Sequence, residues 1–466
     1  MRSKSISRVT VALVAMALIG AACGDSKTAS TTTTTVAGGG AATPTTVGAT
    51  TTTKAPDPLA AIGIDLSKCG ANYNPTQGIA NNEILIGQSV PQSGTFAGFG
   101  LLSTSLKAYF DYANAELNGV NGKKLKLVVK DDAYEPDRTS KNVDEMISKD
   151  GVFAFSGVLG TPNNLAAWDK RNDQCIPHLF PSTGAPDWGD VANHPWTVAG
   201  AVVPYNLEAR MWVDYLKTKF PNGTTVALLE ADNDFGKAYD YWFKKFIAGT
   251  NIKIVETQKH DPAAPNVTNQ MTTLGNSKAE VAIGMTTTGY CTQFLKAIGD
   301  NPNWKPTVKL MSGTCRSSLF IGPAGPGATD SLYLSAGKDL GDPALAQDAD
   351  VVKTRQLAVK YGIAENLLGV SLIPTGWLYG EVLRDVLMRA DAMPGGLTRP
   401  NVLLAARNTD VKSGLILPGV QLKLSGKDDA YLVESARFDK WNGTTFEKAS
   451  DVITTYEGQL KFEKAL

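Results

Sequence analysis

The stretch EILIGQSVPQSGTFAGFGLLSTSLKAYFDYANAEL, residues 83–117, holds a short apolar run, a glycine-rich loop and an amphipathic segment in direct succession. Residues 83–90 have the length and apolar content of a buried strand. Residues 101–117 carry apolar side chains at a spacing of about 3.6 residues, which is typical of a helix that buries one face. The stretch therefore predicts a strand, a loop and a helix, the repeating unit of α/β folds.

The glycine-rich loop does not have the pattern of a nucleotide site. Gly94, Gly98 and Gly100 are spaced as GxxxGxG, whereas dinucleotide-binding loops have GxGxxG. The loop also lacks the lysine and the hydroxyl residue that end a P-loop. Because it follows a strand and precedes a helix, we expect it at the carboxyl edge of a parallel sheet, where glycines let the backbone approach a small ligand.

The same unit recurs along the chain. Strand-like and helix-like segments alternate from residue 83 to about residue 203, and the alternation restarts after Pro204 and continues to about residue 314. Repeated units of this kind imply parallel sheets covered by helices on both faces, and two runs imply two lobes. The expected strands are residues 83–90, 124–132, 152–158, 176–183, 224–232, 252–260, 280–287 and 307–314.

The last third of the chain departs from this alternation. Residues 348–362 and 376–391 have the apolar periodicity of helices. Residues 423–449 predict hairpin-like strands, and the Asn442-Gly443 pair predicts a two-residue turn between two of them.

The composition excludes several classes of protein. Of the 466 residues, 43% are hydrophobic and 19% are charged, which is typical of a globular protein rather than a disordered or fibrous one. The 45 basic and 45 acidic residues balance, so a nucleic acid or another polyanion is not an expected partner.

The N-terminal segment predicts export from the cytoplasm. A basic start is followed by an apolar run at residues 9–22, which ends in small residues before Cys23. Residues 1–22 therefore resemble a bacterial lipoprotein signal peptide, in which the cysteine is lipidated and becomes the new N-terminus. An ordinary secretory signal cut nearby is the alternative. Residues 23–58, rich in Thr, Gly, Ala and Pro, predict a disordered tether between a membrane and the folded part.

Four cysteines remain beyond the signal segment, at Cys69, Cys175, Cys291 and Cys315. An even number in an exported protein predicts two disulfides, with three connectivities open. No spacing of cysteines and histidines indicates a zinc site.

Five stretches follow one another in a familiar order and spacing. They are ILIGQSVPQSGTFAGFG, NGKKLKLVVKDDAYEPDRT, VFAFSGVLGTPNN, IPHLFPSTGAP and VALLEADNDFGKAYDYWFK. Together they resemble the type I periplasmic binding proteins of the branched-chain amino-acid class, which are the substrate receptors of ABC importers. The resemblance covers roughly residues 80–460.

The resemblance implies an α/β fold of two doubly wound parallel-sheet lobes, joined by three crossovers and closing over a small molecule. Under this architecture, Cys69 would pair with Cys175 in lobe 1. Cys291 would pair with Cys315, because both follow neighbouring parallel strands of lobe 2. The expected bounds are residues 80–203 and 338–426 for lobe 1, and residues 204–337 and 427–466 for lobe 2.

Ligands of open α/β sheets bind beyond the carboxyl ends of the strands. The resemblance places the ligand carboxylate at Gly160 and Thr161, where the N–H groups of a helix start favour an anion. It places a main-chain carbonyl that accepts from the ligand at Ser182. Gly184 falls where the family has a carboxylate-binding hydroxyl, for which Thr183 is the available substitute. The alternatives are a helix-capping role for Thr161 and a plain turn for the second loop.

Four further positions complete the implied cleft. Phe99 falls where the family has an aromatic wall, and Phe235 where it stacks a ring, often of Tyr, over the ligand. Simple packing against the next helix is the alternative for Phe235. Thr286 falls where amino-acid binders have a cleft Tyr, and Thr314 where they have the acid that pairs with the ligand ammonium.

The threonine at position 314 is the departure that matters most. An ammonium group taken from water needs a compensating charge or full hydrogen bonding, and no carboxylate is near Thr314 in the sequence. Asp232 or Asp234 is the alternative source of that charge. Arg316 either attracts an anion or is a solvated surface arginine. We therefore expect an amide, an organic acid or an atypical amino acid rather than an ordinary branched-chain amino acid.

Enzymatic functions have little support in the sequence. His178, His194 and His260 are the only histidines, and they lie outside HExxH and GxSxG contexts. The acidic cluster at residues 131–137 lacks the glycine turn and terminal Glu of a calcium loop. We therefore expect no catalytic residue, no metal and no cofactor.

The leading hypothesis is a monomeric, lipid-anchored solute-binding protein that captures a small polar ligand outside the cytoplasmic membrane and delivers it to an ABC permease. Ligand binding would shift an equilibrium between open and closed forms. An extracellular sensor with the same fold and no transport role is the alternative. A third hypothesis, an exported hydrolase, predicts a nucleophile and a base within hydrogen-bond reach in the cleft.

Overall fold

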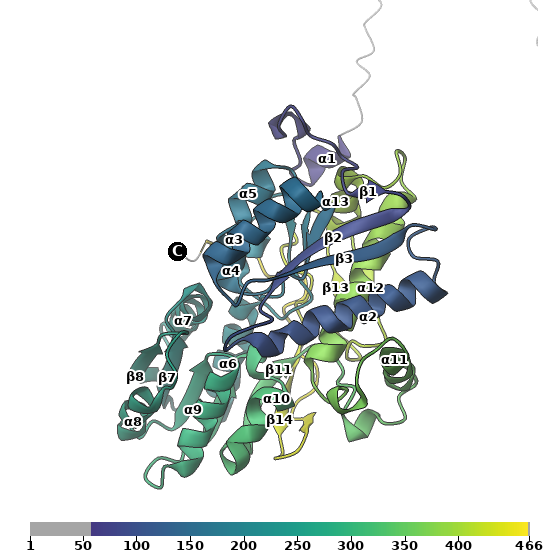
Figure 1. Ribbon diagram of the computed structural model, residues 1–466. Helices are drawn as coiled ribbons and strands as arrows, with labels where there is room; N and C mark the ends of the chain where they lie inside the picture. Colours follow the sequence, from purple (N-terminus) through teal and green to yellow (C-terminus); the bar gives the residue numbers. More distant parts are fainter. Residues whose placement is uncertain (1–56, 465–466) are drawn as a thin grey trace, which may run out of the picture. The chain divides into compact units, whose positions relative to one another are not determined.

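The strands of the protein form two mainly parallel sheets that follow one another along the chain (Figure 1). The computed structural model describes residues 57–464. The predicted signal peptide at residues 1–22, the lipidation site at Cys23 and almost all of the predicted tether at residues 23–58 lie outside the described residues.

The first sheet contains six strands: β1 (Ile79–Ala80), β2 (Glu83–Val90), β3 (Lys124–Asp131), β4 (Ala154–Ser156), β5 (His178–Leu179) and β6 (Thr197–Val198). The order β3-β2-β4-β5-β6 is parallel throughout and doubly wound, while the short β1 pairs antiparallel with β2. Ile84 and Ile86 of β2 are completely buried, as expected for a strand that helices cover on both faces.

The second sheet contains seven strands: β7 (Thr224–Ala231), β8 (Ile252–His260), β9 (Val281–Met285), β10 (Val308–Met311), β11 (Ser331–Ser335), β14 (Arg437–Trp441) and β15 (Phe446–Lys448). The order β8-β7-β9-β10-β11 repeats the plan of the first sheet. Strand β14 then pairs antiparallel with β11, and β15 pairs antiparallel with β14. Two short strands, β12 (Asp410–Val411) and β13 (Leu422–Lys423), pair with each other.

The helices cover the sheets. They are α1 (Pro58–Ala61), α2 (Leu101–Glu116), α3 (Pro136–Glu145), α4 (Thr161–Leu165), α5 (Trp168–Asp173), α6 (Tyr205–Lys219), α7 (Asp234–Ile247), α8 (Thr268–Asn276), α9 (Gly289–Asp300), α10 (Ser318–Ile321), α11 (Ala349–Lys360), α12 (Leu372–Asp391) and α13 (Arg399–Arg407). Helices α3, α4 and α5 lie on one side of the first sheet, and α2 with α12 on the other (Figure 1). No helix within residues 57–464 is both long and apolar enough to cross a membrane.

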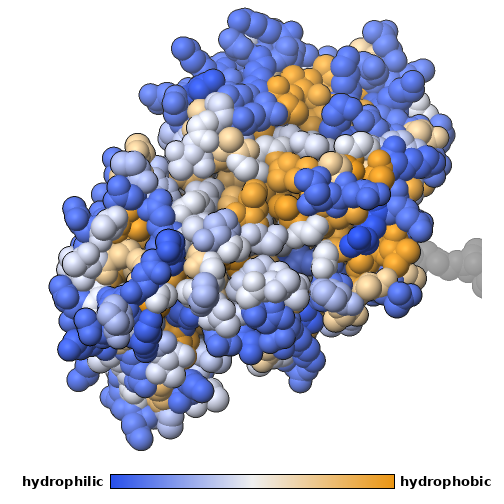
Figure 2. Space-filling view, turned by 60° about the horizontal axis from the view of Figure 1, so that its bottom comes forward, coloured by the Kyte–Doolittle hydropathy of each residue, from blue (hydrophilic) through white to orange (hydrophobic). Residues whose placement is uncertain are grey.

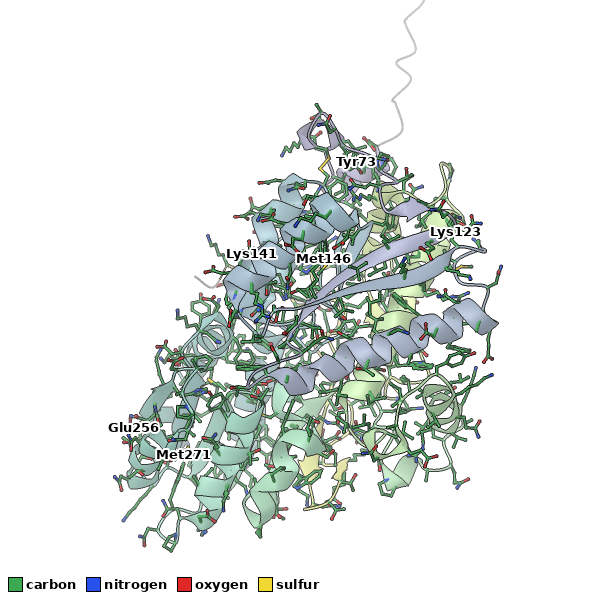
Figure 3. All side chains as sticks on the ribbon, in the orientation of Figure 1. Tyr73, Lys123, Lys141, Met146, Glu256 and Met271 are labelled. Carbon is green, nitrogen blue, oxygen red and sulfur yellow. A yellow bond between two sulfur atoms is a disulfide. The ribbon has the colours of Figure 1, made fainter. Side chains whose placement is uncertain are left out.

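The two faces of the first sheet bury separate groups of side chains. Phe155 of β4 packs with Val143 and Met146 under α3, whereas Ala154 of the same strand belongs to the larger core that includes Leu106 of α2. This alternation follows from the period of two along a strand. Met146 is buried and Lys141 is exposed, and both are labelled in Figure 3.

The chain passes between the two sheets three times. It leaves the first sheet after β6, returns after β11 to α12, which packs on α2, and then adds β14 and β15 to the second sheet. Two α/β lobes with mainly parallel sheets are therefore present, and the predicted fold class is confirmed.

The hairpin at the end of the chain differs from the prediction in its turn. Trp441 pairs with Phe446, so the loop comprises the four residues from Asn442 to Thr445 rather than two. The Asn442 side chain accepts hydrogen bonds from the N–H groups of Thr444 and Thr445, at 2.9 and 3.0 Å, and this arrangement spans the longer loop. Gly443 has a φ of +104°, which explains the glycine.

Both disulfides of the predicted connectivity are present. Cys69 is bonded to Cys175 and Cys291 to Cys315, with Cα–Cα distances of 5.7 and 5.8 Å. The first links the segment before β1 to the end of α5, near Tyr73 in Figure 3. The second ties the first turn of α9 to the loop after β10, so it fixes one wall of the region described below.

The outer surface carries apolar patches among hydrophilic residues. On the face in Figure 2, hydrophobic residues gather across the middle and hydrophilic residues form the rim. Leu319, with 42% of its surface exposed, is one of few large hydrophobic side chains in residues 57–464 that face solvent. Single exposed apolar side chains such as Leu319 are ordinary for a folded protein.

Helix α12 approaches α2 closely because two glycines, Gly376 and Gly380, face it. A Cβ at Gly376 would lie 2.5 Å from the carbonyl oxygen of Leu102, and one at Gly380 would overlap the ring of Tyr109. The two helices could not keep this separation with larger residues.

We expect Gly380→Ala to lower the free energy of unfolding by about 1–3 kcal/mol, because the added methyl group overpacks the α2–α12 contact. Gly289→Ala is the matched control, since a Cβ at Gly289 in helix α9 meets no atom within 4 Å. Urea unfolding of both variants measures the difference, and equal stabilities would show that the helices separate without penalty.

Candidate functional site

A cavity of about 180 Å³ lies where the carboxyl ends of the strands of both sheets converge. Its walls come from the loops after β2, β4, β5 and β6 of the first sheet and from the loops after β7, β9, β10 and β11 of the second. The start of α6, the first turns of α12, Tyr134 after β3 and Leu415, Ile416 and Leu422 near β12 and β13 also line it. Each sheet therefore contributes its carboxyl edge, the place where ligands bind in open α/β sheets.

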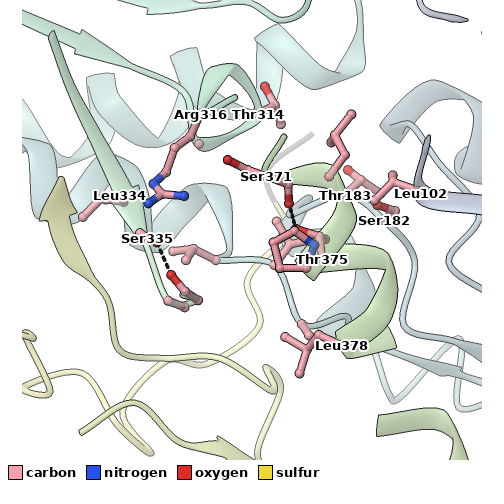
Figure 4. Close-up of a pocket in the computed structure, with 18 of the residues that line it drawn as sticks. Leu102, Ser182, Thr183, Thr314, Arg316, Leu334, Ser335, Ser371, Thr375 and Leu378 are labelled. Atoms are coloured by element: carbon pink, nitrogen blue, oxygen red, sulfur yellow. Dashed lines mark hydrogen bonds between the residues drawn. The ribbon is translucent and has the colours of Figure 1, made fainter. Parts of the chain in front are cut away.

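The structure brings most of the predicted ligand-binding residues together at this cavity. Those that line it are Phe99, Gly160, Thr161, Ser182, Thr183, Phe235, Thr314 and Arg316. Figure 4 shows Ser182 and Thr183 on one side of the cavity and Thr314 and Arg316 on the other.

Gly184 and Thr286 do not line the cavity. A Cβ at Gly184 would lie 2.5 Å from the carbonyl oxygen of Val203, so this glycine serves a close approach of two chain segments. The Thr286 hydroxyl is buried against the His260 ring, with 2.8 Å between Oγ1 and Nε2. Its neighbour Thr287 faces the cavity instead.

A pair of hydroxyl groups connects the segment after β4 to the segment after β5. Thr161 Oγ1 and Thr183 Oγ1 are 2.6 Å apart, and Thr183 Oγ1 is also 3.1 Å from the hydroxyl of Tyr205 at the start of α6. The capping alternative for Thr161 does not apply, because Gly160 is the N-cap of α4 and no side chain caps this helix. Gly160 has a φ of +92°, and a Cβ there would lie 2.7 Å from the Tyr134 ring.

Aromatic rings close the cavity from both sheets. Phe99 meets Phe320 of α10 edge to face, with ring centroids 5.2 Å apart. Phe235 is 2% exposed and packs edge to face on Tyr205, at 5.3 Å. Phe235 is itself part of α7, so it does not pack against the next helix as the alternative proposed; it packs on α6 and also lines the cavity.

Arg316 is not a solvated surface residue. Its side chain is 10% exposed, and its Nη2 is 2.9 Å from Asp339 and 2.5 Å from Asp439. Burial alone would lower the pKa of the guanidinium, but the two carboxylates raise it. Arg437 also pairs with Asp439, at 2.7 Å. The positive charge of Arg316 is thus already balanced by β14 and by the segment after β11.

Glu208 also lines the cavity and was not among the residues predicted from the sequence. It lies in the first turns of α6, is 1% exposed, and accepts a hydrogen bond of 2.9 Å from the backbone N–H of Gly313. Burial raises the pKa of Glu208 to about 8, although the Gly313 hydrogen bond opposes the shift. The sequence did contain a signal, since Glu208 shares a helix face with the apolar residues Tyr205 and Trp212.

The other acids proposed for an ammonium ligand lie elsewhere. Asp232 is exposed and Asp234 begins α7, and neither lines the cavity. Two hydroxyls do face it without a hydrogen-bond partner in residues 57–464, those of Thr287 and Ser371, which are 6% and 8% exposed.

The acidic pair at the end of β3, Asp131 and Asp132, is held by hydrogen bonds within the protein. Hydrogen bonds from Ser93, Gln92 and Ala133 lower the pKa of Asp131 to about 2, although its burial opposes this. Asp132 accepts from Ser89 at 2.7 Å. Both carboxylates therefore fasten the loops beside the cavity. Within residues 57–464, no group of three or more Cys, His, Asp and Glu side chains is placed to hold a metal.

The raised pKa of Glu208 predicts a pH-dependent effect of Glu208→Gln on stability. The folded protein keeps the Glu208 proton up to about pH 8, whereas the unfolded chain loses it near pH 4.5. Wild-type stability therefore declines between these values, and glutamine does not titrate. In urea unfolding, we expect the advantage of Glu208→Gln over wild type to grow by about 1–4 kcal/mol from pH 5.5 to pH 8.5. The exposed Glu365→Gln is the control, and a pH-independent difference would contradict the burial argument.

A family model described as "Periplasmic binding protein" matches residues 83–440. Among curated proteins, the comparison found no match to the sequence. Three solved structures of similar fold illustrate the range of compounds named for proteins with this fold. A branched-chain amino acid ABC transporter protein of Thermus thermophilus with bound valine is 19% identical, with a TM-score of 0.71, and the match covers 80% of this chain and 96% of that one.

The other two structures are described with compounds other than branched-chain amino acids. A fatty acid ABC transporter substrate-binding protein of Thermomonospora curvata is 17% identical, with a TM-score of 0.68 and coverage of 85% and 98%. A solute-binding protein of Rhodopseudomonas palustris in complex with 3,4-dihydroxybenzoic acid is 17% identical, with a TM-score of 0.66 and coverage of 80% and 98%. At these identities the similarity establishes the fold.

Proposed function

The chain belongs to the periplasmic binding protein family, whose model matches more than half of it, and we propose that it is an extracytoplasmic receptor that captures a small molecule for an ABC importer. The observation that carries this proposal is the cavity, which takes its walls from the carboxyl edges of both sheets. A ligand in that position contacts both lobes at once, so it favours the form in which they are closed.

We propose lobe bounds of 80–203 with 338–426, and 204–337 with 427–466. The sheet memberships support this division, because β14 and β15 lie in the second sheet and α12 packs on α2. The contact between Phe99 and Phe320 joins the two lobes. Phe99 lines the cavity, so opening of the cleft would separate this pair of rings.

The ligand is small, and its chemistry is set by the lining rather than by the fold. Structures of this fold hold valine in one case and 3,4-dihydroxybenzoic acid in another. In this chain, the predicted residues Thr161, Ser182 and Thr183 supply polar groups from the first lobe, and Phe99 and Phe235 supply apolar surface. No step in this function requires a catalytic residue or a cofactor.

A thermal-shift screen against amino acids, amines, amides and organic acids tests the receptor function. Ligand that binds only the folded form raises the melting temperature, and a compound at 100 times its Kd stabilises by about 2.7 kcal/mol. We expect at least one compound to raise the melting temperature at millimolar concentration. A screen without any shift would overturn the proposal.

For the compound with the largest shift, we expect Thr161→Ala to weaken binding by about 2- to 10-fold, because one hydrogen bond of about 0.5–1.5 kcal/mol is lost. Titration calorimetry measures the change. Thr272→Ala, at an exposed position of α8, is the matched control. If both variants bind as the wild type does, Thr161 does not contact the ligand.

We also propose that Cys23 carries a lipid anchor and that residues 23–58 tether the folded part to the outer face of the cytoplasmic membrane. The basic and apolar segments before Cys23 support this. We expect the wild type in the membrane fraction of producing cells and Cys23→Ser in the soluble fraction, with Ser26→Ala as the control. A wild-type protein found entirely in the soluble fraction would contradict the anchor.

A further inference from the structure

The acidic and basic side chains of the cavity are Glu208, Arg316, Lys338 and Asp339. Three of them are already paired within the protein. Arg316 is bound to Asp339 and to Asp439 outside the cavity, and Lys338 Nζ is 2.7 Å from Asp348. Within residues 57–464, no lysine, arginine or histidine forms an ion pair with Glu208, which accepts a hydrogen bond of 2.9 Å from the Gly313 backbone N–H and lies next to the phenol of Tyr239.

The structure leaves space for the Glu208 carboxylate beside the cavity. A Cβ at Gly313 would lie 2.7 Å from Glu208 Oε1, so the glycine leaves room for the acid. The groups that face Glu208 are the phenol of Tyr205 on the same helix, the phenol of Tyr239 on α7 and the Gly313 N–H. Thr314, the next residue along this loop, also lines the cavity. The carboxylate thus reaches the loop after β10 from α6.

We propose that the ligand carries a protonated amine on an apolar body and that Glu208 is the counter-ion of that amine. This inference rests on the proposed receptor function. An anionic ligand would meet cations that are already paired, and separating a buried pair is costly. A cationic ligand would meet a buried acid that has no charged partner, and it would complete the pair.

The remaining lining fits the rest of such a molecule. The hydroxyls of Thr287 and Ser371 have no partner within the described chain and can accept further N–H groups of an ammonium. Leu102, Leu334 and Leu378 present apolar surface around the same space (Figure 4). Among residues 57–464, no unpaired cation lines the cavity, so a carboxylate on the ligand adds no ion pair, and a simple amine is expected to bind at least as well as the corresponding amino acid.

The pairing makes binding dependent on pH. Burial holds the pKa of free Glu208 at about 8, so the acid is protonated at pH 6.5 and must release its proton to pair with an ammonium group. The affinity for an amine therefore rises with pH, by nearly tenfold from pH 6.5 to pH 7.5. A ligand that accepts a hydrogen bond from neutral Glu208 would show the opposite trend above pH 8.

Titration calorimetry with matched compounds tests the proposal. The panel comprises 3-methylbutylamine, phenethylamine and cyclohexylmethylamine, each with the carboxylate and the amide of the same skeleton, and L-leucine and L-phenylalanine. We expect binding by at least one amine, tighter at pH 7.5 than at pH 6.5, and at least tenfold weaker binding by its carboxylate and its amide. Binding of carboxylates or amides in preference to amines overturns the counter-ion assignment and leaves the receptor function intact. No binding by any compound counts against both.

The variant Glu208→Gln removes the negative charge of the side chain while keeping nearly the same size and shape. Glutamine keeps an acceptor for the Gly313 N–H but cannot ionise, so we expect at least a tenfold loss of amine affinity and loss of the pH dependence. Asp232→Asn, an exposed acid outside the cavity, is the control and should change affinity less than twofold. An unfolding curve at each pH verifies that Glu208→Gln is folded. Amine affinity within twofold of wild type in Glu208→Gln overturns the proposal.

Discussion

Parallel pairing is the constraint on which the site depends. In a parallel sheet every strand ends at the same edge, and the chain must cross over through a helix before the next strand begins. Both sheets of this protein have the same doubly wound order, so each has one edge at which the loops after its strands gather. The cavity lies where these two edges meet, and it takes residues from loops that are separated by more than 200 positions in the sequence.

The antiparallel strand β14 of the second sheet supplies one of the charges beside the cavity wall. Strand β14 brings Asp439 next to β11, where it binds Arg316 from the loop after β10. Asp339, from the segment after β11, binds the same guanidinium. These contacts hold three chain segments together in a poorly solvated place, where unpaired charges would be costly. The arginine thereby serves the architecture of the wall, and its charge is not free for a ligand.

Much of the fold followed from the sequence because buried parallel strands are continuous apolar runs. Residues 83–90 and 252–260 were predicted with the bounds that the structure has. Strand β11 was missed because Ser331 and Ser335 frame its apolar residues. Both serines are buried and bonded to nearby carbonyl oxygens, which a pattern of hydropathy cannot show. Helix α13 did carry a signal, a capping Thr398 followed by Pro400 in the first turn, and it could have been recognised.

Some residues that line the cavity were predicted from the sequence, and one ionisable residue, Glu208, was not. Thr161 and Phe235 lie in the first turns of the helices that follow β4 and β7, and the resemblance could place them because motif order along the chain follows the order of strands and helices. Glu208 was missed because its role depends on a tertiary contact with Gly313, which is 105 residues away. The resemblance implies an acid at the position of Thr314, and Glu208 reaches the same loop from α6. A charged residue that faces the ligand can come from a distant part of the sequence. Residues close to Thr314 in the sequence are therefore not the only candidates for a counter-ion. For this reason the ionisable side chains that line the cavity, and the pairs they already form, constrain ligand charge more directly than any single aligned position does.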